Sequence, residues 1–243
     1  MSDQKVAVVT GAGSGIGFAT ITLLQKAGFI SCGVDVEFRE TGHYWHILCD
    51  VKDERSVVAA CEEVIDAHGR IDVLVNCAGV HLAKPLDETL TSEFDVVAQV
   101  NMRGVFFWMR EAMPHLKKTG GVIVNVASGV AVASDPTAPL YSASKAWIVG
   151  LTTALFLDYP RTCVRVHAVL PGPTDTPFLS KACGNSLAAI EECGSNIPLG
   201  RLARPEEVAG VIMFLVSDAG QIMGPVIDCS GGETVNFKAE QRW

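Results

Sequence analysis

Residues 6–17 read VAVVTGAGSGIG, an apolar run that passes into a loop with glycine at every second position from residue 11 to residue 17. The run predicts a buried strand, and the glycines predict a tight turn into a helix. Backbone N–H groups at such a helix start, with the positive end of the helix dipole, bind the pyrophosphate of a dinucleotide. The spacing departs from the general G-x-G-x-x-G fingerprint, because Ile16 stands where the third glycine falls. A glycine-rich turn that only packs is the alternative for this stretch taken alone.

An acidic residue about twenty positions after the glycine loop supplies the second signal. The segment 29–36 (FISCGVDV) is apolar until Asp35, which predicts a strand that ends in a carboxylate. There a carboxylate accepts hydrogen bonds from both hydroxyls of an adenosine ribose, whereas a 2′-phosphate meets a like charge. The loop contains no Arg or Lys to offset that charge, so we predict NAD rather than NADP. Without the glycine loop, a solvated carboxylate at a strand end would be the better explanation of Asp35.

The composition limits the class of protein. The chain has 243 residues, of which 49% are hydrophobic and 19% are charged, enough apolar material for the core of one ordinary α/β domain. Its net charge is −8 and it has no basic stripe, so nucleic acid and anionic membranes are poor candidate partners. The N-terminus runs directly into a strand without a leader, and no apolar run approaches a membrane span. We therefore expect a soluble, cytoplasmic protein.

The cysteines and histidines indicate neither disulfides nor a metal. The eight cysteines are scattered through predicted strands and helices and form no C-x-x-C motif. Buried free thiols are therefore expected. The six histidines show no H-E-x-x-H or other ligand spacing, and Cys183 with Cys193 is too loose a pair to imply zinc.

Apolar runs of strand length alternate with helical patterns along the chain, which is typical of a parallel sheet. The strands are continuously apolar, so helices should cover both faces of the sheet. No repeat or linker divides the chain, and we expect residues 1–243 to form one Rossmann-like, doubly wound α/β domain with about seven strands. The predicted strands are 6–10, 30–35, 46–49, 73–76, 122–127, 165–170 and 225–228. The predicted helices are about 15–28, 54–68, 92–118, 140–157 and 205–217.

The link between the second and third predicted strands is unusually short. Only about eight to ten residues (EFRETGHYW) separate Asp35 from the third strand, below the ten to twelve that a helical crossover usually needs. We therefore expect no full helix there. The adenine side of the cofactor site should be more open, with Tyr44 or Trp45 covering apolar surface instead.

The chemistry is predicted by Tyr141 and Lys145 in LYSASKAW. Four residues apart on a helix, the phenol and the ammonium group project from one face within reach of each other. The attraction between the phenolate and a unit positive charge ~4 Å away is roughly 4 kcal/mol at an effective dielectric of about 20. That is about three pKa units, enough to bring a phenol from about 10 towards 7. Such a base takes the proton of an alcohol as hydride leaves its carbon.

Two polar residues supply the context for this pair. Ser128 follows the apolar run 121–127, and a hydroxyl at the carboxyl end of a strand lies in the crevice where open α/β sheets bind ligands. There it could hydrogen-bond the substrate oxygen and hold it against Tyr141, although an ordinary strand-end serine in a turn is the commoner case. Asn101 lies within a helical pattern, where a short amide is a poor helix former and usually indicates a local bond or water.

Taken together, these motifs resemble those of the short-chain dehydrogenase/reductases, and the resemblance covers essentially the whole chain. Residues 10–17 are similar to the family's T-G-x-x-x-G-x-G loop, residues 50–51 to its adenine-contacting D-V, residues 76–79 (NCAG) to N-N-A-G, and residues 171–176 (PGPTDT) to the P-G segment at the nicotinamide end. Asn101, Ser128, Tyr141 and Lys145 are similar to its catalytic tetrad.

The resemblance implies a role for each of these residues. Tyr141 is the general base or acid, Lys145 lowers its pKa and binds the nicotinamide ribose, Ser128 orients the substrate oxygen, and Asn101 holds a water that links Lys145 to solvent. It also implies a homotetramer, or at least a dimer, formed through the helices 92–118 and 140–157. The residues assigned to NAD are Gly11, Ser14, Gly15, Ile16, Gly17, Asp35, Asp50, Val51, Asn76, Ala78, Gly79, Tyr141, Lys145, Pro171, Gly172, Thr174 and Thr176.

Two features depart from the family pattern. Cys77 replaces the second Asn of N-N-A-G, which removes amide hydrogen bonds near the cofactor and could loosen the turn. The crossover helix after Asp35 is missing, which changes the surroundings expected for the ribose. Neither departure touches the proton-transfer residues.

The segment 177–199 follows the P-G segment and should fold over the substrate as a lid. It carries Lys181, Glu191 and Glu192 but no arginine cluster, so a neutral alcohol is favoured over a phosphorylated one. Phe178, Leu179 and Trp147 are candidate pocket walls, with a core role at least as good an explanation for Trp147. Cyclic alcohols, dihydrodiols, polyols and hydroxysteroids all remain open.

Two other functions compete with this prediction. An NAD-sensing regulatory protein would keep the fold and the glycine loop without turnover, but the intact set of Tyr141, Lys145 and Ser128 argues against it. A 3-oxoacyl-carrier-protein reductase would prefer NADPH and carry basic residues for its acidic carrier. Asp35 and the acidic charge balance both disfavour that function.

Overall fold

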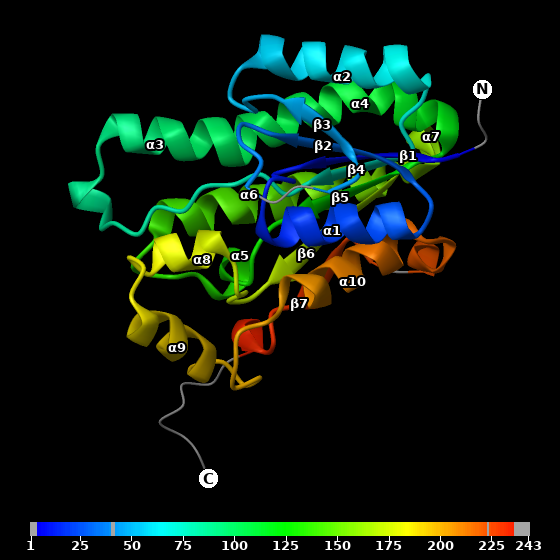
Figure 1. The fold of residues 1–243 in the computed structure, drawn as a ribbon. Coiled ribbons are helices and arrows are strands. Elements are labelled where there is room, and N and C mark those ends of the chain that lie inside the picture. The colour runs from blue at the N-terminus through cyan, green and yellow to red at the C-terminus, as the bar shows by residue number, and fades with distance from the viewer. Residues whose placement is uncertain (1–3, 40–41, 223, 236–243) are drawn as a thin grey trace.

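Seven strands form one parallel sheet in the order β3-β2-β1-β4-β5-β6-β7 (Figure 1). The computed structural model describes residues 4–39, 42–222 and 224–235, so the first three and last eight residues of the predicted domain lie outside the described part. The strands agree with the predicted ones to within a residue at each end, as expected for continuous apolar runs. They are β1 (Val6–Thr10), β2 (Ile30–Asp35), β3 (Trp45–Leu48), β4 (Val73–Asn76), β5 (Val122–Val126), β6 (Arg165–Pro171) and β7 (Val226–Cys229).

Helices cover both faces of the sheet, as predicted (Figure 1). On one face the core is formed with α2 (Glu54–His68), α4 (Val105–Thr119) and α6 (Pro139–Leu157). On the other face it is formed with α1 (Gly15–Lys26) and α10 (Pro205–Val216). All residues of β1, β4 and β5 are buried, which explains why these strands read as unbroken apolar runs.

The strand order reverses between β1 and β4, and this is the point where open α/β sheets bind ligands. Polar residues mark it: Thr10, Asn76 and Asn125 lie side by side in register on β1, β4 and β5. The Asn76 amide donates to Asn125 Oδ1 at 2.8 Å, and the Asn125 amide donates to Thr152 Oγ1 of α6 at 2.9 Å. These two buried hydrogen bonds fix α6 relative to the strand ends.

The predicted helix over residues 92–118 is helical throughout, but it is not one regular α-helix. The segment forms α3 (Thr91–Ala98), then a π-helical stretch η2 (Gln99–Gly104), and then α4. The structure also contains several helices that were not predicted, because they are too short to produce a periodic pattern of apolar residues. They are η1 (Leu86–Glu88), α5 (Val130–Ala133), α7 (Tyr159–Thr162), α8 (Pro177–Ala182), α9 (Leu187–Ser195), η3 (Asp218–Ile222) and η4 (Glu233–Val235).

The short link between β2 and β3 contains no helix in its described residues, 36–39 and 42–44. Tyr44 is buried and its hydroxyl donates to the Ala12 carbonyl of the glycine loop at 3.2 Å. Its ring packs with Phe18 and Phe38, with centroids 6.4 and 6.2 Å away. Tyr44 therefore covers this surface as predicted, whereas Trp45 is 44% exposed and does not.

Helix α6 has 19 residues and a mean hydropathy of 1.3, so by length and composition alone it could span a membrane. In the structure it packs against the sheet, with Tyr141, Lys145 and Ile148 buried. It is a core helix that carries two of the predicted catalytic residues into the interior.

Candidate active site

The glycine loop leaves the start of α1 open to an anion. Gly11 has φ +67°, and a Cβ there would lie 2.8 Å from the Ala78 nitrogen; a Cβ on Gly17 would lie 2.0 Å from the Gly11 oxygen. Only glycine fits this turn. The N-cap residue Ser14 makes no side-chain cap, and no acidic residue lies in the first helical turn. This helix start thus has neither a side-chain cap from Ser14 nor an acidic side chain in its first turn, and it fits a pyrophosphate.

Asp35 fastens the glycine loop to the end of β2. Its Oδ2 accepts a hydrogen bond from the Gly13 nitrogen at 2.9 Å, and its Oδ1 accepts one from the Val36 nitrogen at 2.7 Å. The carboxylate is half-buried at the strand end, where a ribose would lie, and so is not merely a solvated group. The sequence argument overlooked one cation: Arg39 lies four residues further on and forms an ion pair with Glu37 at 3.5 Å.

The N-C-A-G turn is held firmly despite Cys77. The Thr10 hydroxyl oxygen accepts hydrogen bonds from the nitrogens of Cys77 and Ala78, at 3.0 and 3.1 Å. These backbone bonds do not depend on the side chain at residue 77, so the expected loosening is not seen. Burial raises the pKa of the Cys77 thiol to about 12, which makes it an inert small side chain rather than a nucleophile.

Asn101 lies at the centre of the π-helical stretch and is fully buried. Its Oδ1 accepts from the Val80 nitrogen at 2.9 Å, and its Nδ2 donates to the Val80 oxygen and to Ser144 Oγ, both at 3.0 Å. The local bond expected for this residue is therefore made with a loop 21 residues earlier in the chain. Single-turn π-bulges of this kind are frequent at functional sites.

We expect Asn101→Ala to lower the free energy of unfolding by about 3 kcal/mol, because both backbone groups of Val80 lose their partner inside the protein. Ser144→Ala, which leaves the Val80 bonds intact, should cost about 1 kcal/mol. Urea unfolding of the two variants measures the difference. Equal stability of Asn101→Ala and the wild type would show that these bonds do not hold the bulge.

Tyr141 and Lys145 lie on the same face of α6, as predicted. The Lys145 nitrogen is 5.7 Å from the centroid of the Tyr141 ring and donates to the Val126 carbonyl at 2.9 Å. Ser128 follows β5, and a hydrogen bond joins it to the Tyr141 phenol. Gly79 lies against this group, since a Cβ there would be 3.5 Å from both Asn101 Oδ1 and Lys145 Nζ. The four predicted catalytic residues are thus brought together.

The electrostatics of the pair differ from the sequence argument. Burial raises the pKa of Tyr141 above its ordinary value, and the hydrogen bond with Ser128 only partly opposes this. The expectation that Lys145 alone brings the pKa of the phenol towards 7 is wrong for the protein without cofactor. Burial also lowers the pKa of Lys145 to about 8, because an ammonium group removed from water loses the solvation that favours its charge.

The P-G segment joins the glycine loop to the predicted lid. Thr176 caps α8 by accepting from the Leu179 nitrogen at 3.2 Å, and its methyl group lies 3.0 Å from where a Cβ of Gly15 would be. The Thr174 hydroxyl donates to the Gly172 carbonyl at 2.9 Å. Both threonine hydroxyls therefore stabilise the segment itself.

The remaining predicted cofactor residues also lie at the carboxyl edge of the sheet. Asp50 and Val51 follow β3, and Val51 is buried against Gly104. Pro171 ends β6, and its oxygen accepts from the Gly129 nitrogen at 2.8 Å. The glycine loop, Asp35 and this row of strand ends form one continuous edge that fits an extended dinucleotide.

Three side chains around Tyr141 complete the site. Phe178 of α8 lies 6.2 Å from the Tyr141 ring, as the predicted wall position requires, whereas Trp147 packs against the core. The His81 ring lies 4.7 Å from Tyr141. Glu233 acts electrostatically on the same phenol. Sequence reasoning missed the last two residues, because no motif marks them and only the fold brings them to Tyr141.

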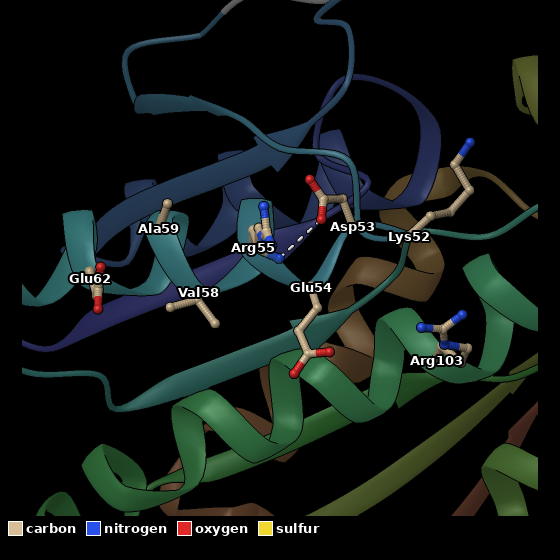
Figure 2. A pocket seen from close by; sticks show the side chains of 8 residues that line it. All are labelled: Lys52, Asp53, Glu54, Arg55, Val58, Ala59, Glu62 and Arg103. Atoms are coloured by element: carbon tan, nitrogen blue, oxygen red, sulfur yellow. Dashed lines mark hydrogen bonds between the residues drawn. The ribbon is translucent and has the colours of Figure 1, made fainter.

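A surface hollow of about 590 Å³ lies elsewhere, between the start of α2 and Arg103 (Figure 2). Its lining includes Lys52, Asp53 and Glu62 and none of the four predicted catalytic residues. Within it, the Arg55 nitrogen donates to Asp53 Oδ1 at 3.1 Å, which caps α2. The hollow is an open, charged groove at a helix end and not the reaction site.

Comparisons with known proteins agree with this geometry. A family model described as Enoyl-(Acyl carrier protein) reductase matches residues 11–234. The chain is 37% identical to cis-4-hydroxycyclohexanecarboxylate dehydrogenase of Sinomonas cyclohexanicum, over 95% of this chain and 97% of that protein. It is also 37% identical to meso-2,3-butanediol dehydrogenase of Serratia marcescens, over 96% of each chain. The structure of 3-ketoacyl-(acyl-carrier-protein) reductase from Brucella melitensis complexed with NADH superposes with a TM-score of 0.86 and 32% identity, over 95% of this chain and 98% of that one.

Proposed function

The chain belongs to the short-chain dehydrogenase/reductase family, and from this premise we propose that it oxidises a neutral secondary alcohol with NAD and reduces the matching ketone. It is a nicotinamide-dependent oxidoreductase of alcohols and ketones, as its relatives are. The main support for the proposal is that the side chains of Tyr141, Lys145 and Ser128 lie together at the end of the sheet that carries the glycine loop.

The cofactor is assigned to the carboxyl edge of the sheet. The open N-terminus of α1 takes the pyrophosphate, and Asp35 takes the hydroxyls of the adenosine ribose. Lys145, beside Gly79, reaches the nicotinamide end. A bound nicotinamide dinucleotide supplies the hydride acceptor. The full assigned set is Gly11, Ser14, Gly15, Ile16, Gly17, Asp35, Asp50, Val51, Asn76, Ala78, Gly79, Tyr141, Lys145, Pro171, Gly172, Thr174 and Thr176.

The side chains of the protein handle the proton. Ser128 donates a hydrogen bond to the substrate oxygen and holds it beside the Tyr141 phenol, which removes the hydroxyl proton as a base. The ammonium group of Lys145 stabilises the phenolate, since an opposite charge nearby favours the charged form of a group. Asn101 positions the loop at Val80 and, with a bound water, relays protons from Lys145 to solvent.

The substrate is assigned to the space between Tyr141 and the lid, residues 177–199. Phe178 supplies an apolar wall. The lid has no arginine, and its charged residues are Lys181, Glu191 and Glu192. A neutral alcohol is therefore favoured over a phosphorylated one. A second candidate is reduction of a 3-oxoacyl thioester, which the similarity to the Brucella melitensis reductase supports.

The test is an assay of NADH formation at the nicotinamide absorbance over a panel of secondary alcohols. The panel contains cyclohexanol, cyclohexanediols, 2,3-butanediol, polyols and a hydroxysteroid, with acetoacetyl thioester and NADPH as a separate arm. We expect NADH formation with at least one neutral alcohol. Turnover of the thioester alone would establish the second candidate. Binding of NAD without any turnover would make the chain a cofactor sensor.

The proposal includes a homotetramer, or at least a dimer, in the cytoplasm. Large apolar side chains are exposed around α3, α4 and the end of α6, in the region assigned to subunit contacts: Phe94, Val96, Phe106, Leu157 and Tyr159. All eight cysteines are free thiols in the structure, which suits a reducing compartment.

A further inference from the structure

The lid contains two short helices, α8 and α9, that form a hairpin (Figure 1). α8 is followed by two residues in the left-handed region, Gly184 with φ +60° and Asn185 with φ +59°. The Asn185 nitrogen donates to the Ser180 carbonyl at 2.7 Å, which closes the turn. α9 begins after Ser186, whose hydroxyl accepts from the Ala189 nitrogen at 3.4 Å and caps the helix. The turn therefore has a defined geometry and sets how α9 lies beside α8.

The hairpin brings two thiol groups into contact. Cys183 directly follows α8, and Cys193 lies in the last turn of α9. Their Sγ atoms are 3.6 Å apart, and both residues are partly exposed. A disulfide bond is about 2.05 Å long, so the sulfur atoms need to approach by roughly 1.5 Å to be joined. The pair is therefore close to bonding geometry while both thiols remain free.

Both cysteines are held by fixed backbone. The Cys183 nitrogen donates to the Leu179 carbonyl at 2.9 Å. Next to Cys193, Gly194 is buried so tightly that an added Cβ would lie 2.8 Å from the Leu202 nitrogen. The contact between the sulfur atoms is thus set by the packing of the lid and is not a chance approach of two loose side chains.

The thiol pair does not form a metal site. A structural zinc ion needs more ligands than two cysteines supply. Among the described residues, no group of three or more histidine, cysteine, aspartate or glutamate side chains could hold a metal ion. Two thiols in contact are instead suited to oxidation to a disulfide.

Helix α8 borders the reaction centre. The ring of Phe178 on α8 lies 6.2 Å from the Tyr141 ring and 6.1 Å from the His81 ring, measured between centroids. At the start of α8, the Thr176 methyl group packs against the glycine loop at Gly15. A segment that covers a substrate must open for entry and release. A bond that ties α8 to α9 therefore acts on a wall of the substrate space.

We propose that Cys183 and Cys193 are a redox-active pair that a peroxide converts to a disulfide, which ties α8 to α9 and slows turnover until a thiol reduces it. Burial raises the pKa of the Cys193 thiol, so Cys183 supplies the attacking thiolate. The effect on turnover rests on the proposed function, whereas the formation of the disulfide does not.

Hydrogen peroxide is a sufficient oxidant for this step. The Cys183 thiolate attacks one peroxide oxygen, the O–O bond breaks, and the other oxygen leaves as hydroxide, which takes up the proton that the thiol released. The Cys193 sulfur then attacks the sulfur of the resulting sulfenic acid; the S–S bond forms, the S–O bond breaks, and the hydroxyl leaves with the Cys193 proton as water. The two thiols lose two electrons and the peroxide is reduced to water. An added dithiol reverses the change and becomes a disulfide itself.

Peptide mass mapping tests whether the bond forms. Trypsin cleaves after Lys181 and Arg201, so both cysteines fall in one peptide, residues 182–201, and Cys163 falls in another. The full-length proteins are treated with hydrogen peroxide, denatured, alkylated and digested. Cys163 is exposed, so its variant is the matched control. The proteins compared are wild type, Cys183→Ser, Cys193→Ser and Cys163→Ser.

In the wild type and in Cys163→Ser, we expect peptide 182–201 to lose two hydrogen atoms, about 2 Da, and to take up no alkyl group. Dithiothreitol added before alkylation should restore both thiols. Neither Cys183→Ser nor Cys193→Ser should show this change. Two alkylated thiols in the wild-type peptide after peroxide, or a sulfinic acid in place of the disulfide, would overturn the pairing.

Hydrogen exchange and turnover test the effect on the lid. In the oxidised wild type, amide exchange of residues 184–192 should slow by up to about 100-fold, the loop-closure effect expected for cysteines ten residues apart. Oxidation should lower kcat for NADH formation in the wild type, reversibly with dithiothreitol, and leave kcat of both serine variants of the pair unchanged.

The outcomes separate this inference from the proposed function. If the disulfide forms but exchange and kcat stay the same, its role in the lid is overturned and the proposed function stands. If no alcohol is oxidised by any of the proteins, the proposed function fails, and the mass and exchange measurements decide the disulfide and its effect on the lid on their own.

Discussion

Tyr141→Phe lowers kcat for alcohol oxidation by about 10²- to 10⁴-fold, the share of the rate that a positioned general base supplies. The phenylalanine ring keeps the contacts of the tyrosine ring with His81 and Phe178, whose centroids lie 4.7 and 6.2 Å away. Folding and the shape of the pocket are therefore retained, and only the proton acceptor beside Ser128 is lost. The effect should fall on kcat and leave KM close to the wild-type value.

The pH profile tests the same role. Because burial raises the pKa of Tyr141, the phenol is protonated at neutral pH in the protein alone, and oxidation should accelerate as the pH rises. The rise should level off near pH 8, where Lys145, with a pKa of about 8, loses the charge that stabilises the phenolate. Ketone reduction uses the protonated phenol, which persists over this range, and should therefore change little between pH 7 and pH 8. Tyr141→Phe should abolish the pH dependence of oxidation in its residual activity.

Tyr159→Phe is the matched control, since it removes a phenol hydroxyl from α7, where the ring is 44% exposed. Its kcat and its pH profile should equal those of the wild type. The measurements are initial rates across pH and thermal unfolding of all three proteins. Undiminished kcat in Tyr141→Phe, with unfolding at the wild-type temperature, would remove the phenol from the mechanism.

The strand ends were the most predictable part of this site. β1, β2 and β4 have the predicted bounds, because a strand covered on both faces must be apolar throughout and stops where polar groups meet the ligand crevice. Thr10, Asp35 and Asn76 are the final residues of these three strands. Their position along the chain therefore determines their position in space.

The rest of the site depends on contacts between segments far apart in the sequence. The π-helical stretch is stabilised by the bonds between Asn101 and Val80, and a helical pattern does not show such a partner. The His81 ring lies 4.7 Å from Tyr141, and Glu233 acts on the phenol through its charge; both come from segments that only the fold brings near Tyr141. The pKa of Tyr141 was predicted in the wrong direction because helical spacing shows the neighbouring Lys145 but not the desolvation of the phenol.

Asp35→Asn should raise the ratio of kcat/KM with NADP to that with NAD by about 100-fold. A carboxylate about 4 Å from one charge of a 2′-phosphate costs roughly 4 kcal/mol at an effective dielectric of about 20, and part of this is screened by solvent. Asparagine keeps an acceptor oxygen for the Gly13 nitrogen, so the glycine loop stays attached to β2. The change should therefore appear as cofactor preference and not as loss of stability.

Asp66→Asn removes the same charge from an exposed position on α2 and should leave the cofactor ratio at its wild-type value. Arg39→Ala tests the opposing possibility, since this guanidinium group could leave Glu37 and pair with a 2′-phosphate. If Asp35 governs the choice, wild type and Arg39→Ala both favour NAD by about 100-fold in steady-state assays with each cofactor. Equal use of NADP by the wild type, lost in Arg39→Ala, would mean that Arg39 outweighs the carboxylate and that the assignment of NAD is wrong.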